Sequence, residues 1–587
     1  MPREREQPKS IARRRSVESI TKEFRGVGFF LFLTSGLINI LALTGAFYML
    51  QIYDRALTSG SIPTLVALSV LAIGLYLFQG VFDVIRSQVL VRVGARLDRR
   101  LAPLAHKVAV DMPRYGFSNA ESLERGRDVD VVRTFLGSQG PMALFDLPWV
   151  PIYLVFAYFL HPMLGALTFG GAFVLALMTV AAELMLRRLS SHAQQSGVSR
   201  GAIADSNARN SEILKAMGFA DKAVMRFEDA NSEHLALQTR SSDINGTFGA
   251  ISRVLRMILQ SAILGLGAYL TIIGELSAGA IIASSIASSR ALAPIDLAIT
   301  NWKGVVSARH SFRRLIDTVT ALNETPKPMA LPAPKSTLTV DKITIVAPAS
   351  GRILLSDVAF ELKAGQALGV IGPSASGKTT FVRALTGVWP VLRGSVRLDG
   401  AELGQWEDSA AGKFIGYLPQ DVSLLDATIE ENISRYADQP DPAGVISAAK
   451  AAGVHDMIVH LQEGYHTHIG PSGMVLSAGQ RQRIGLARAL YNDPFLVVMD
   501  EPNSNLDGEG EAALTEAIRG IRARGGIAIV IAHRPSALAA VDLVAVVQNG
   551  KMIAFGPKSE ILAPQPVGGR PAAPTMATKN YVQGAMP

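Results

Sequence analysis

Eight consecutive residues, Gly372 to Thr379, have the types and the spacing of a phosphate-binding loop. They read Gly372-Pro-Ser-Ala-Ser-Gly-Lys-Thr, with a strand-like run before them and a helix-like run after them, which is the context that the pattern G-x-x-x-x-G-K-T requires. Loop amides and a helix N-terminus attract phosphate. We expect Lys378 to reach the terminal phosphates and the Thr379 hydroxyl to bind magnesium. The predicted nucleotide-binding residues here are Gly372, Pro373, Ser374, Ala375, Ser376, Gly377, Lys378, Thr379 and Thr380.

Two later strand-like runs end in residues that suit phosphate chemistry. Residues 495–499 are apolar and lead into Asp500 and Glu501. We expect Asp500 to bind magnesium and Glu501 to orient or deprotonate the attacking water. Residues 527–532 end at His533, which is placed to contact the γ-phosphate, although a lone histidine after a strand is more often structural. The order of the three strand ends predicts hydrolysis of a nucleoside triphosphate.

The elements that carry these groups belong to the second half of the chain. From about Thr337, short β-branched runs alternate with helical stretches, which indicates an α/β domain. A Pro-rich stretch precedes it, and the chain after about Ala563 is rich in Pro, Gly and Ala. We predict a linker over 321–336, an α/β nucleotide-binding domain over 337–562 and a disordered tail over 563–587.

The first half is apolar enough for a membrane. The 587-residue chain has a mean hydropathy of +0.26, and only 18% of it is charged. A helix that crosses the bilayer needs about 20 apolar residues. The candidate segments cover about 27–52, 62–84, 143–160, 164–186, 257–273 and 278–300. The sixth is the weakest by hydropathy, because serines and Arg290 interrupt it. We therefore predict a six-helix transmembrane domain over 27–320, after a basic N-terminus over 1–26.

Lys and Arg predict the orientation of these helices, because they concentrate in cytoplasmic segments. They are dense before the first span, between the second and third spans (Arg86 opens that group) and between the fourth and fifth spans. The alternate loops carry almost none. Both termini are therefore predicted to be cytoplasmic. This topology explains the net charge of +8 and leaves nucleic-acid binding without its main support.

Four ionisable residues lie in or near the spans, where charge is costly and often marks a pathway or an interhelix pair. We expect Glu183 and Asp296 to sit at the cytoplasmic ends of their helices, as does Arg253. For Asp146 and Arg290 the sequence leaves a role in a pathway and a role in helix pairing equally open.

A further motif lies between the strand-like run before the phosphate loop and the run over residues 495–499. The run that begins Leu476-Ser-Ala-Gly-Gln-Arg-Gln resembles the signature helix of ABC transporters, with Ala478 in place of the commoner glycine. Ser477 and the Gly479 amide at a helix start would form a second anion-binding end. The resemblance implies that Ser477, Gly479 and Gln480 contact a nucleotide held by the opposite copy of a homodimer.

Other positions match the same family in chain order. Gln420, in Tyr417-Leu-Pro-Gln, matches the loop that senses magnesium and the membrane domain, so the resemblance implies that it contacts nucleotide and metal. Asp507 ends Ser504-Asn-Leu-Asp, which matches the D-loop, and His533 matches the switch histidine. The implied fold is a six-span ABC exporter followed by a P-loop ATPase, with ATP and Mg²⁺ as cofactors.

Strings in the first half are similar to the type I secretion ABC proteins, in the branch that exports proteases, lipases and S-layer proteins. They are residues 47–55, 145–154 and 285–296. This resemblance implies an ATPase in the inner membrane of a Gram-negative bacterium. Its cargo would be an unfolded polypeptide with an uncleaved C-terminal signal. Its partners would be a second copy, a periplasmic adaptor, an outer-membrane channel and the lipid bilayer.

Two positions depart from the family pattern. ABC exporters usually stack adenine on an aromatic residue, and Ala347 stands about where it is expected. A glutamate usually precedes the signature, and Pro471 stands near that place. An exporter of lipids or amphiphilic drugs remains the nearest alternative. A soluble ABC ATPase acting on nucleic acid or ribosomes conflicts with the apolar spans, and a small-molecule kinase has no use for a signature motif.

Overall fold

The computed structural model describes residues 25–323, 331–348, 350–406, 408–470, 473, 475–532 and 535–562. The predicted tail, residues 1–24 of the predicted N-terminus and residues 324–330 of the predicted linker lie outside this set. The chain divides into two compact units. The first comprises Met1–Pro113 and Phe117–Thr325, and the second comprises Arg114–Gly116 and Pro326–Pro587.

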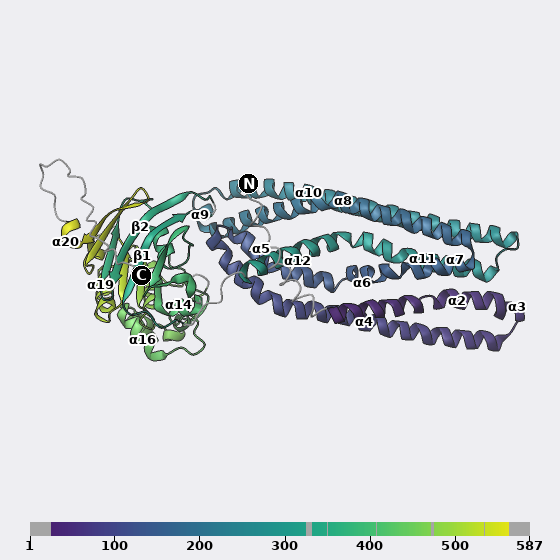
Figure 1. Cartoon of the computed structure of the whole chain (residues 1–587), viewed down its shortest axis with the longest axis horizontal. Coiled ribbons are helices and arrows are strands. Elements are labelled where there is room, and N and C mark those ends of the chain that lie inside the picture. Colours follow the sequence, from purple (N-terminus) through teal and green to yellow (C-terminus); the bar gives the residue numbers. More distant parts are fainter. Residues whose placement is uncertain are drawn as a thin grey trace, which may run out of the picture. The chain divides into compact units, whose positions relative to one another are not determined.

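Within the described residues, the first unit contains six helical segments long and apolar enough to cross a membrane (Figure 1). They are Arg25–Ser59, Ile62–Tyr115, Gln139–Leu160, Pro162–Arg209, Ala220–Ile272 and Ala278–Thr300. The predicted six-span architecture is therefore confirmed. The sixth has the lowest hydropathy of the set, yet it is the most buried, with 61% of its central window inside the protein.

Three of the helices are far longer than a bilayer is thick. They are α4 (Ile62–Asp111), α8 (Pro162–Arg209) and α10 (Ala220–Ile272), with 50, 48 and 53 residues. At 1.5 Å per residue each extends about 75 Å, whereas the hydrocarbon core is about 30 Å thick. Each therefore continues well beyond its apolar segment. Shorter elements complete the unit: α5 (Asn119–Leu136), α9 (Ser211–Ala216), α11 (Ala278–Thr300) and α12 (Trp302–Asn323). The 3₁₀ turn η2 (Met112–Tyr115) follows α4, and its last two residues are assigned to the second unit.

The third span is broken where its prolines lie. It consists of α6 (Gln139–Asp146), the 3₁₀ turn η3 (Leu147–Trp149) and α7 (Val150–Leu160). Pro148 lies in the 3₁₀ turn, and Pro151 lies in the first turn of α7, where its missing N–H costs least.

The first span ends in irregular helical turns, and hydrogen bonds connect this end to the start of α11. It finishes with α2 (Thr44–Gln51), the π-helix η1 (Ile52–Ala56) and α3 (Leu57–Ser59). Asp54, on the π-helix, accepts hydrogen bonds from the Ser277 hydroxyl at 2.7 Å and the Gly279 N–H at 3.0 Å. A carboxylate at a helix N-terminus is electrostatically favourable, so Asp54 anchors the start of α11.

The second unit contains two sheets, which form from the β-branched runs predicted from the sequence. The first is antiparallel with the order β2-β1-β4-β5, and the second has the order β10-β9-β3-β8-β7-β6. In the second sheet β9, β3, β8, β7 and β6 are parallel, and β10 pairs antiparallel with β9. The strands are β1 (Thr337–Val346), β2 (Ile353–Lys363), β3 (Ala367–Ile371), β4 (Arg393–Leu398), β5 (Ala401–Glu402), β6 (Ile415–Leu418), β7 (Leu496–Asp500), β8 (Ile527–Ile531), β9 (Leu543–Gln548) and β10 (Lys551–Pro557).

The parallel strands form the core of this unit, because β7 and β8 are buried at every position. Parallel strands place all their carboxyl ends at one edge, which is where ligands bind in α/β sheets. The helices of the unit are α13 (Lys378–Leu385), α14 (Asp408–Phe414), α15 (Ile429–Ile433), α16 (Pro442–Ala451), α17 (His455–Val459), α18 (Ala478–Leu490), α19 (Gly508–Ala523) and α20 (Lys558–Ile561), with 3₁₀ turns η4 (Leu403–Gln405), η5 (Gly464–His466) and η7 (Pro535–Leu538).

Candidate nucleotide-binding and hydrolysis site

The predicted phosphate loop connects the end of β3 to the start of α13, as the motif requires. Two glycines fix its course. A Cβ on Gly372 (φ +154°) would lie 2.0 Å from the Val547 carbonyl oxygen, and one on Gly377 (φ +104°) would lie 2.7 Å from Leu355 Cδ1. These positions accept only glycine, since any side chain would collide with neighbouring strands.

Lys378 is almost completely buried at the start of α13. Its Nζ donates hydrogen bonds to the carbonyl oxygens of Gly372 at 2.9 Å and Pro373 at 2.8 Å, so it closes the loop on itself. Burial lowers the pKa of Lys378, while Glu501 and Asp500 act in the opposite direction. The Ser376 hydroxyl is buried in the same loop, with no hydrogen-bond partner among the described residues. A bound phosphate would supply the acceptor that this hydroxyl lacks.

Asp500 lies at the carboxyl end of β7 with an exposed fraction of 1%. Neither of its carboxylate oxygens meets a hydrogen-bond donor of normal geometry within the part of the chain that the structure describes. Burial raises the pKa of Asp500, and the Thr379 hydroxyl, Arg383 and Lys378 offset part of that effect. A buried carboxylate without a partner is costly, and a cation would relieve that cost.

Asp500 and Thr379 suit magnesium better than they suit a metal ion whose ligands all come from the protein. Among the described residues no group of three or more His, Asp or Glu could hold a metal ion. Magnesium typically uses one or two protein ligands and takes the rest from water and substrate phosphates. Asp500 and Thr379 provide such a partial set beside the phosphate loop.

Gln420 and Glu501 meet although 81 residues separate them in the chain. The Gln420 Nε2 donates a hydrogen bond to Glu501 Oε2 at 3.1 Å. Glu501 follows β7 with φ +48°, a left-handed conformation that non-glycine residues seldom adopt and that is often found at functional sites. The structure thus places the predicted water-orienting carboxylate against the predicted sensing glutamine.

The third predicted strand end, that of β8, lies at the same edge of the sheet as the ends of β3 and β7. The strand β8 lies between β3 and β7, so its carboxyl end lies between those that precede Gly372 and Glu501. The predicted γ-phosphate contact, His533, follows two residues after β8 and lies outside the described residues. Its role stays a prediction. Pro471, which stands near the place of the family's glutamate, also lies outside the described residues.

The predicted signature residues begin α18, where two of them bind each other. The Ser477 hydroxyl accepts a hydrogen bond from the Gln480 N–H at 3.2 Å, and the Ser477 N–H donates to Gln480 Oε1 at 2.8 Å. This is a capping box, and the pattern Ser-x-x-Gln is a sequence signal for it. The resemblance implies a nucleotide contact for both residues, and the structure adds a local role that was not predicted.

The other signature positions pack against the segment after Glu501. A Cβ on Gly479 would lie 2.9 Å from the Asn505 carbonyl oxygen, so a glycine permits this approach. Gln482 donates from Nε2 to the Pro502 carbonyl at 3.1 Å. The predicted D-loop residue Asp507 caps α19, because its Oδ1 accepts from the Gly510 N–H at 2.9 Å.

The signature and the phosphate loop do not meet within one chain. No hydrogen bond or ion pair between described residues joins 372–380 to 477–480. Gln420 and Ala478 instead line a common cavity of about 310 Å³. The predicted contact of the signature residues with a nucleotide therefore stays a prediction.

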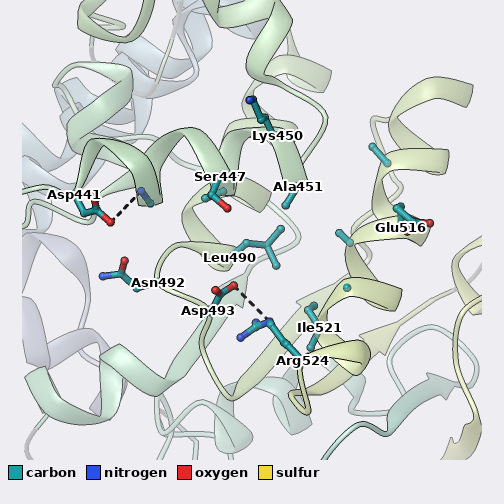
Figure 2. Close-up of a pocket in the computed structure, with 15 residues that line it drawn as sticks. Asp441, Ser447, Lys450, Ala451, Leu490, Asn492, Asp493, Glu516, Ile521 and Arg524 are labelled. Atoms are coloured by element: carbon teal, nitrogen blue, oxygen red, sulfur yellow. Dashed lines mark hydrogen bonds and ion pairs between the residues drawn. The ribbon is translucent and has the colours of Figure 1, made fainter.

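A larger cavity, of about 550 Å³, lies elsewhere in this unit, between α16 and α19 (Figure 2). Asp441 caps α16 at one end, and Asp493 pairs with Arg524 at 3.6 Å near the other. None of the predicted nucleotide-binding or catalytic residues lines this cavity. The volume of a cavity therefore does not identify the nucleotide site. The residues suited to phosphate chemistry lie instead at the carboxyl ends of the parallel strands.

In the first unit, Asp146 belongs to a buried interhelix network. Its Oδ1 accepts hydrogen bonds from Arg86 Nη1 at 2.6 Å and Asn39 Nδ2 at 2.9 Å. The Tyr153 hydroxyl donates to Asn39 Oδ1 at 2.9 Å. Arg86 also contacts Ser35 at 3.1 Å. Of the two roles left open for Asp146, the structure supports helix pairing.

The structure corrects the predicted surroundings of Arg86. By its position it falls among the basic residues predicted to lie in the cytoplasmic segment between the second and third spans. In the structure it is only 6% exposed, because α4 continues through it and packs it against the first and third spans. The other two acidic groups also have cationic neighbours: Asp296 lies 3.7 Å from Arg256, and Glu183 lies 3.5 Å from Arg309.

Comparisons with known proteins agree with this arrangement. Residues 27–292 match the ABC transporter transmembrane region family, and residues 355–504 match the ABC transporter family. The type I secretion system ATP-binding protein PrsD of Rhizobium meliloti is 50% identical, over 92% of each chain. The leukotoxin translocation ATP-binding protein LktB of Mannheimia haemolytica is 28% identical, over 89% of this chain and 75% of its own.

A solved structure supports the same fold. A bacterial Atm1-family ABC exporter with ATP bound aligns with a TM-score of 0.79 at 23% identity, covering 92% of this chain and 96% of its own. That likeness concerns the fold alone. With two family domains in the expected order and a relative that is 50% identical along most of both chains, the chain belongs to the ABC transporter family, in the type I secretion branch of membrane-embedded export ATPases.

Proposed function

We propose that this chain forms a homodimer that hydrolyses Mg²⁺-ATP to export an unfolded polypeptide with an uncleaved C-terminal signal. The observation that carries the hydrolytic part is Asp500, a buried carboxylate without a hydrogen bond of normal geometry among the described residues, beside a complete phosphate loop. The observation that carries the export part is the 50% identity to a type I secretion ATP-binding protein over 92% of both chains.

In this proposal the phosphate loop holds the triphosphate through its amides and Lys378. Lys378 would exchange its contacts with the loop carbonyls for contacts with the phosphates. Thr379 and Asp500 would hold magnesium, with Gln420 nearby. Bound magnesium would neutralise charge that develops on the phosphates. The remaining nucleotide-binding residues are those predicted above, from Gly372 to Thr380.

Hydrolysis would depend on Glu501, which orients or deprotonates the attacking water, and on His533, which contacts the γ-phosphate. The hydrogen bond from Gln420 holds Glu501 at this edge of the sheet. Release of that bond would free the carboxylate for water. Gln420 would thereby couple the state of the nucleotide to the availability of the base.

Dimerisation would complete each site. The signature residues Ser477, Gly479 and Gln480 have no bond to their own phosphate loop, which suits a contact with the nucleotide of the opposite copy. Asp507 would support this contact from the start of α19. Closing and reopening of the two nucleotide-binding domains would drive the membrane helices.

The proposed location is the inner membrane of a Gram-negative bacterium, with both termini in the cytoplasm. The proposed partners are a periplasmic adaptor, an outer-membrane channel and the secreted polypeptide. The printed names of the relatives, which concern type I secretion and leukotoxin translocation, support this assignment. No nucleic-acid partner is proposed.

The test of the site is the Glu501→Gln variant in nanodiscs. The amide keeps the shape and the contact with Gln420 but cannot act as a base, so we expect hydrolysis to fall by roughly 100-fold or more while ATP stays bound. The measurements are phosphate release and retention of labelled ATP. A variant that hydrolyses and exports like the unmodified protein would refute the role of Glu501.

A further inference from the structure

The helix α11 is the most enclosed of the six spans. It packs against α2, α6, α7, α8 and α10, and Figure 1 shows it within the helix bundle of the first unit. Fourteen of its 23 residues are buried. A helix enclosed to this extent has little surface left for lipid, so the residues that remain uncovered identify what it faces.

From Ile286 onward, the uncovered residues of α11 lie along one face, a stripe that also includes the half-buried Ser289 and the exposed Thr300. Ile286, Arg290, Ala293 and Leu297 recur at intervals of four, three and four residues, which places them on one face of a helix. Arg290 and Leu297 are exposed, and the other two are half-buried, whereas the opposite faces are closed by neighbouring helices.

Arg290 lies near the middle of the helix α11. It follows Ala278 by 12 residues in a 23-residue helix, about 18 Å along the axis. No hydrogen bond or ion pair within the described residues involves its guanidinium, whereas Asp146 and Asp296 on neighbouring segments both have cationic partners. A charge at this depth is stable only in water or against a counter-charge.

The backbone carbonyl of Arg290 also needs a polar partner. Pro294 lies inside α11 and has no N–H, so it cannot donate the helical hydrogen bond that the Arg290 carbonyl would otherwise accept. Both the carbonyl of Arg290, which lacks its regular helical donor, and the guanidinium therefore need polar company. Lipid cannot provide it.

A dry contact with a second copy is also unfavourable. In a two-fold symmetric dimer the same patch meets itself, so two Arg290 side chains would approach each other with like charge. Water between the two stripes removes this conflict. The arrangement requires a hydrated space beside the middle of α11 with a fixed positive charge on its wall.

We infer that Arg290 lines the water-filled passage for the exported polypeptide and favours acidic segments of the passing chain. This inference rests on the proposed function for its cargo, and it assigns to Arg290 the pathway role that the sequence left open. The charge would act as an electrostatic selector rather than as a binding pocket, because the stripe around it consists of small and aliphatic side chains.

The chain contains no cysteine, so a single substitution introduces a unique thiol. We would place it at Ala293→Cys, one turn from Arg290 on the same stripe. The matched control is Ile73→Cys, which is 58% exposed at a similar depth on α4. Both are treated in nanodiscs with an anionic and a cationic methanethiosulfonate. We expect the Ala293→Cys variant to react and the Ile73→Cys variant, which faces lipid, to remain unreacted.

Charge is then tested in the Ala293→Cys background. Adding Arg290→Gln should lower the ratio of anionic to cationic reaction rates by roughly tenfold, whereas Arg290→Lys should preserve it and controls for folding. An unfolded Asp/Glu-rich peptide should slow the reaction only when residue 290 is cationic, and its Asn/Gln twin should not.

Three results would overturn the inference: no reaction of the Ala293→Cys variant, a rate ratio unchanged by Arg290→Gln, or equal protection by the acidic peptide and its amide twin. An immediate disulfide between protomers without reagent access would also overturn it, since it would mean a dry contact. These measurements need no exported cargo, so their failure is distinguishable from failure of the proposed export function.

Discussion

Asp500 in the nucleotide-binding unit and Asp146 in the membrane unit are both largely enclosed, but their surroundings differ. Asp146 accepts hydrogen bonds from Arg86 and Asn39. Asp500 has no partner of normal geometry among the described residues. Because a buried charge without a partner is unstable, the fold has satisfied the first aspartate and left the second for a ligand. The first should therefore matter for stability and the second for activity.

The largest expected effect is that of Asp500→Asn on hydrolysis. Loss of the proposed magnesium ligand should lower ATP turnover by roughly 100-fold or more. Without nucleotide the free energy of unfolding should stay equal or rise, because an unpaired buried charge disappears. Phosphate release and thermal unfolding of the full chain measure the two effects. An Asp500→Asn variant that is less stable but hydrolyses ATP at the normal rate would contradict the role of Asp500 in activity.

Asp146→Asn should show the opposite pattern. The change removes the more enclosed of the two carboxylates that pair with buried Arg86 and leaves only the more exposed Asp83, at 2.9 Å. The loss should cost about 2 kcal/mol of stability. Denaturant unfolding in detergent measures this cost, and Arg86→Met combined with Asp146→Asn should recover part of it. The control is Asp205→Asn, which breaks an exposed pair with Arg209 and should cost less than about 0.5 kcal/mol. Equal costs for the two pairs would contradict the assigned burial.

Ala347→Tyr should have a smaller effect, confined to nucleotide affinity. Ala347 stands about where ABC exporters carry the aromatic residue that stacks on adenine, at the turn between β1 and β2, where its N–H donates to the Arg352 carbonyl at 2.8 Å. An added ring should stabilise bound adenine by about 1 kcal/mol, which lowers KM for ATP roughly fivefold. Steady-state kinetics with ATP and GTP measure it. An unchanged KM would place the base elsewhere.

The smallest effect concerns Asp399, an exposed aspartate with backbone partners. Burial alone would raise its pKa, but hydrogen bonds from the N–H groups of Lys335, Ser336 and Thr337 outweigh it and lower the pKa. Its stabilising contribution is present above the unfolded pKa and is lost as pH falls through the folded pKa. The stability gap between the unmodified protein and Asp399→Asn, at most about 1 kcal/mol at pH 7, should shrink toward pH 3.5. A gap independent of pH would contradict the assignment.

Much of the fold follows from sequence patterns that are local. Hydrophobic length predicts six spans, including α11, whose predicted range 278–300 matches the helix. Its low hydropathy reflects serines that pack inside: Ser288 is 1% exposed and shares a hydrogen bond of 2.8 Å with Thr168. A scale that scores residues singly counts such serines against a membrane helix, although their hydroxyls are satisfied there.

Contacts between distant residues could not be predicted in the same way. Arg86 and Asp146 are 60 residues apart, and Gln420 and Glu501 are 81 apart. No periodicity links such positions, so Arg86 was assigned to a cytoplasmic segment by its place in the chain. The capping box of Ser477 and Gln480 is different, because its Ser-x-x-Gln pattern was readable and was overlooked beside the resemblance to the signature motif.

The most direct test of the account is the ATPase activity of the purified chain in nanodiscs, with and without C-terminal fragments of proteins encoded beside it. We predict that one such fragment changes the rate or the apparent affinity for ATP, that a scrambled peptide does not, and that Glu501→Gln abolishes the response. Stimulation by lipids or amphiphilic drugs, with no response to any peptide, would leave the ATPase in place and contradict polypeptide export.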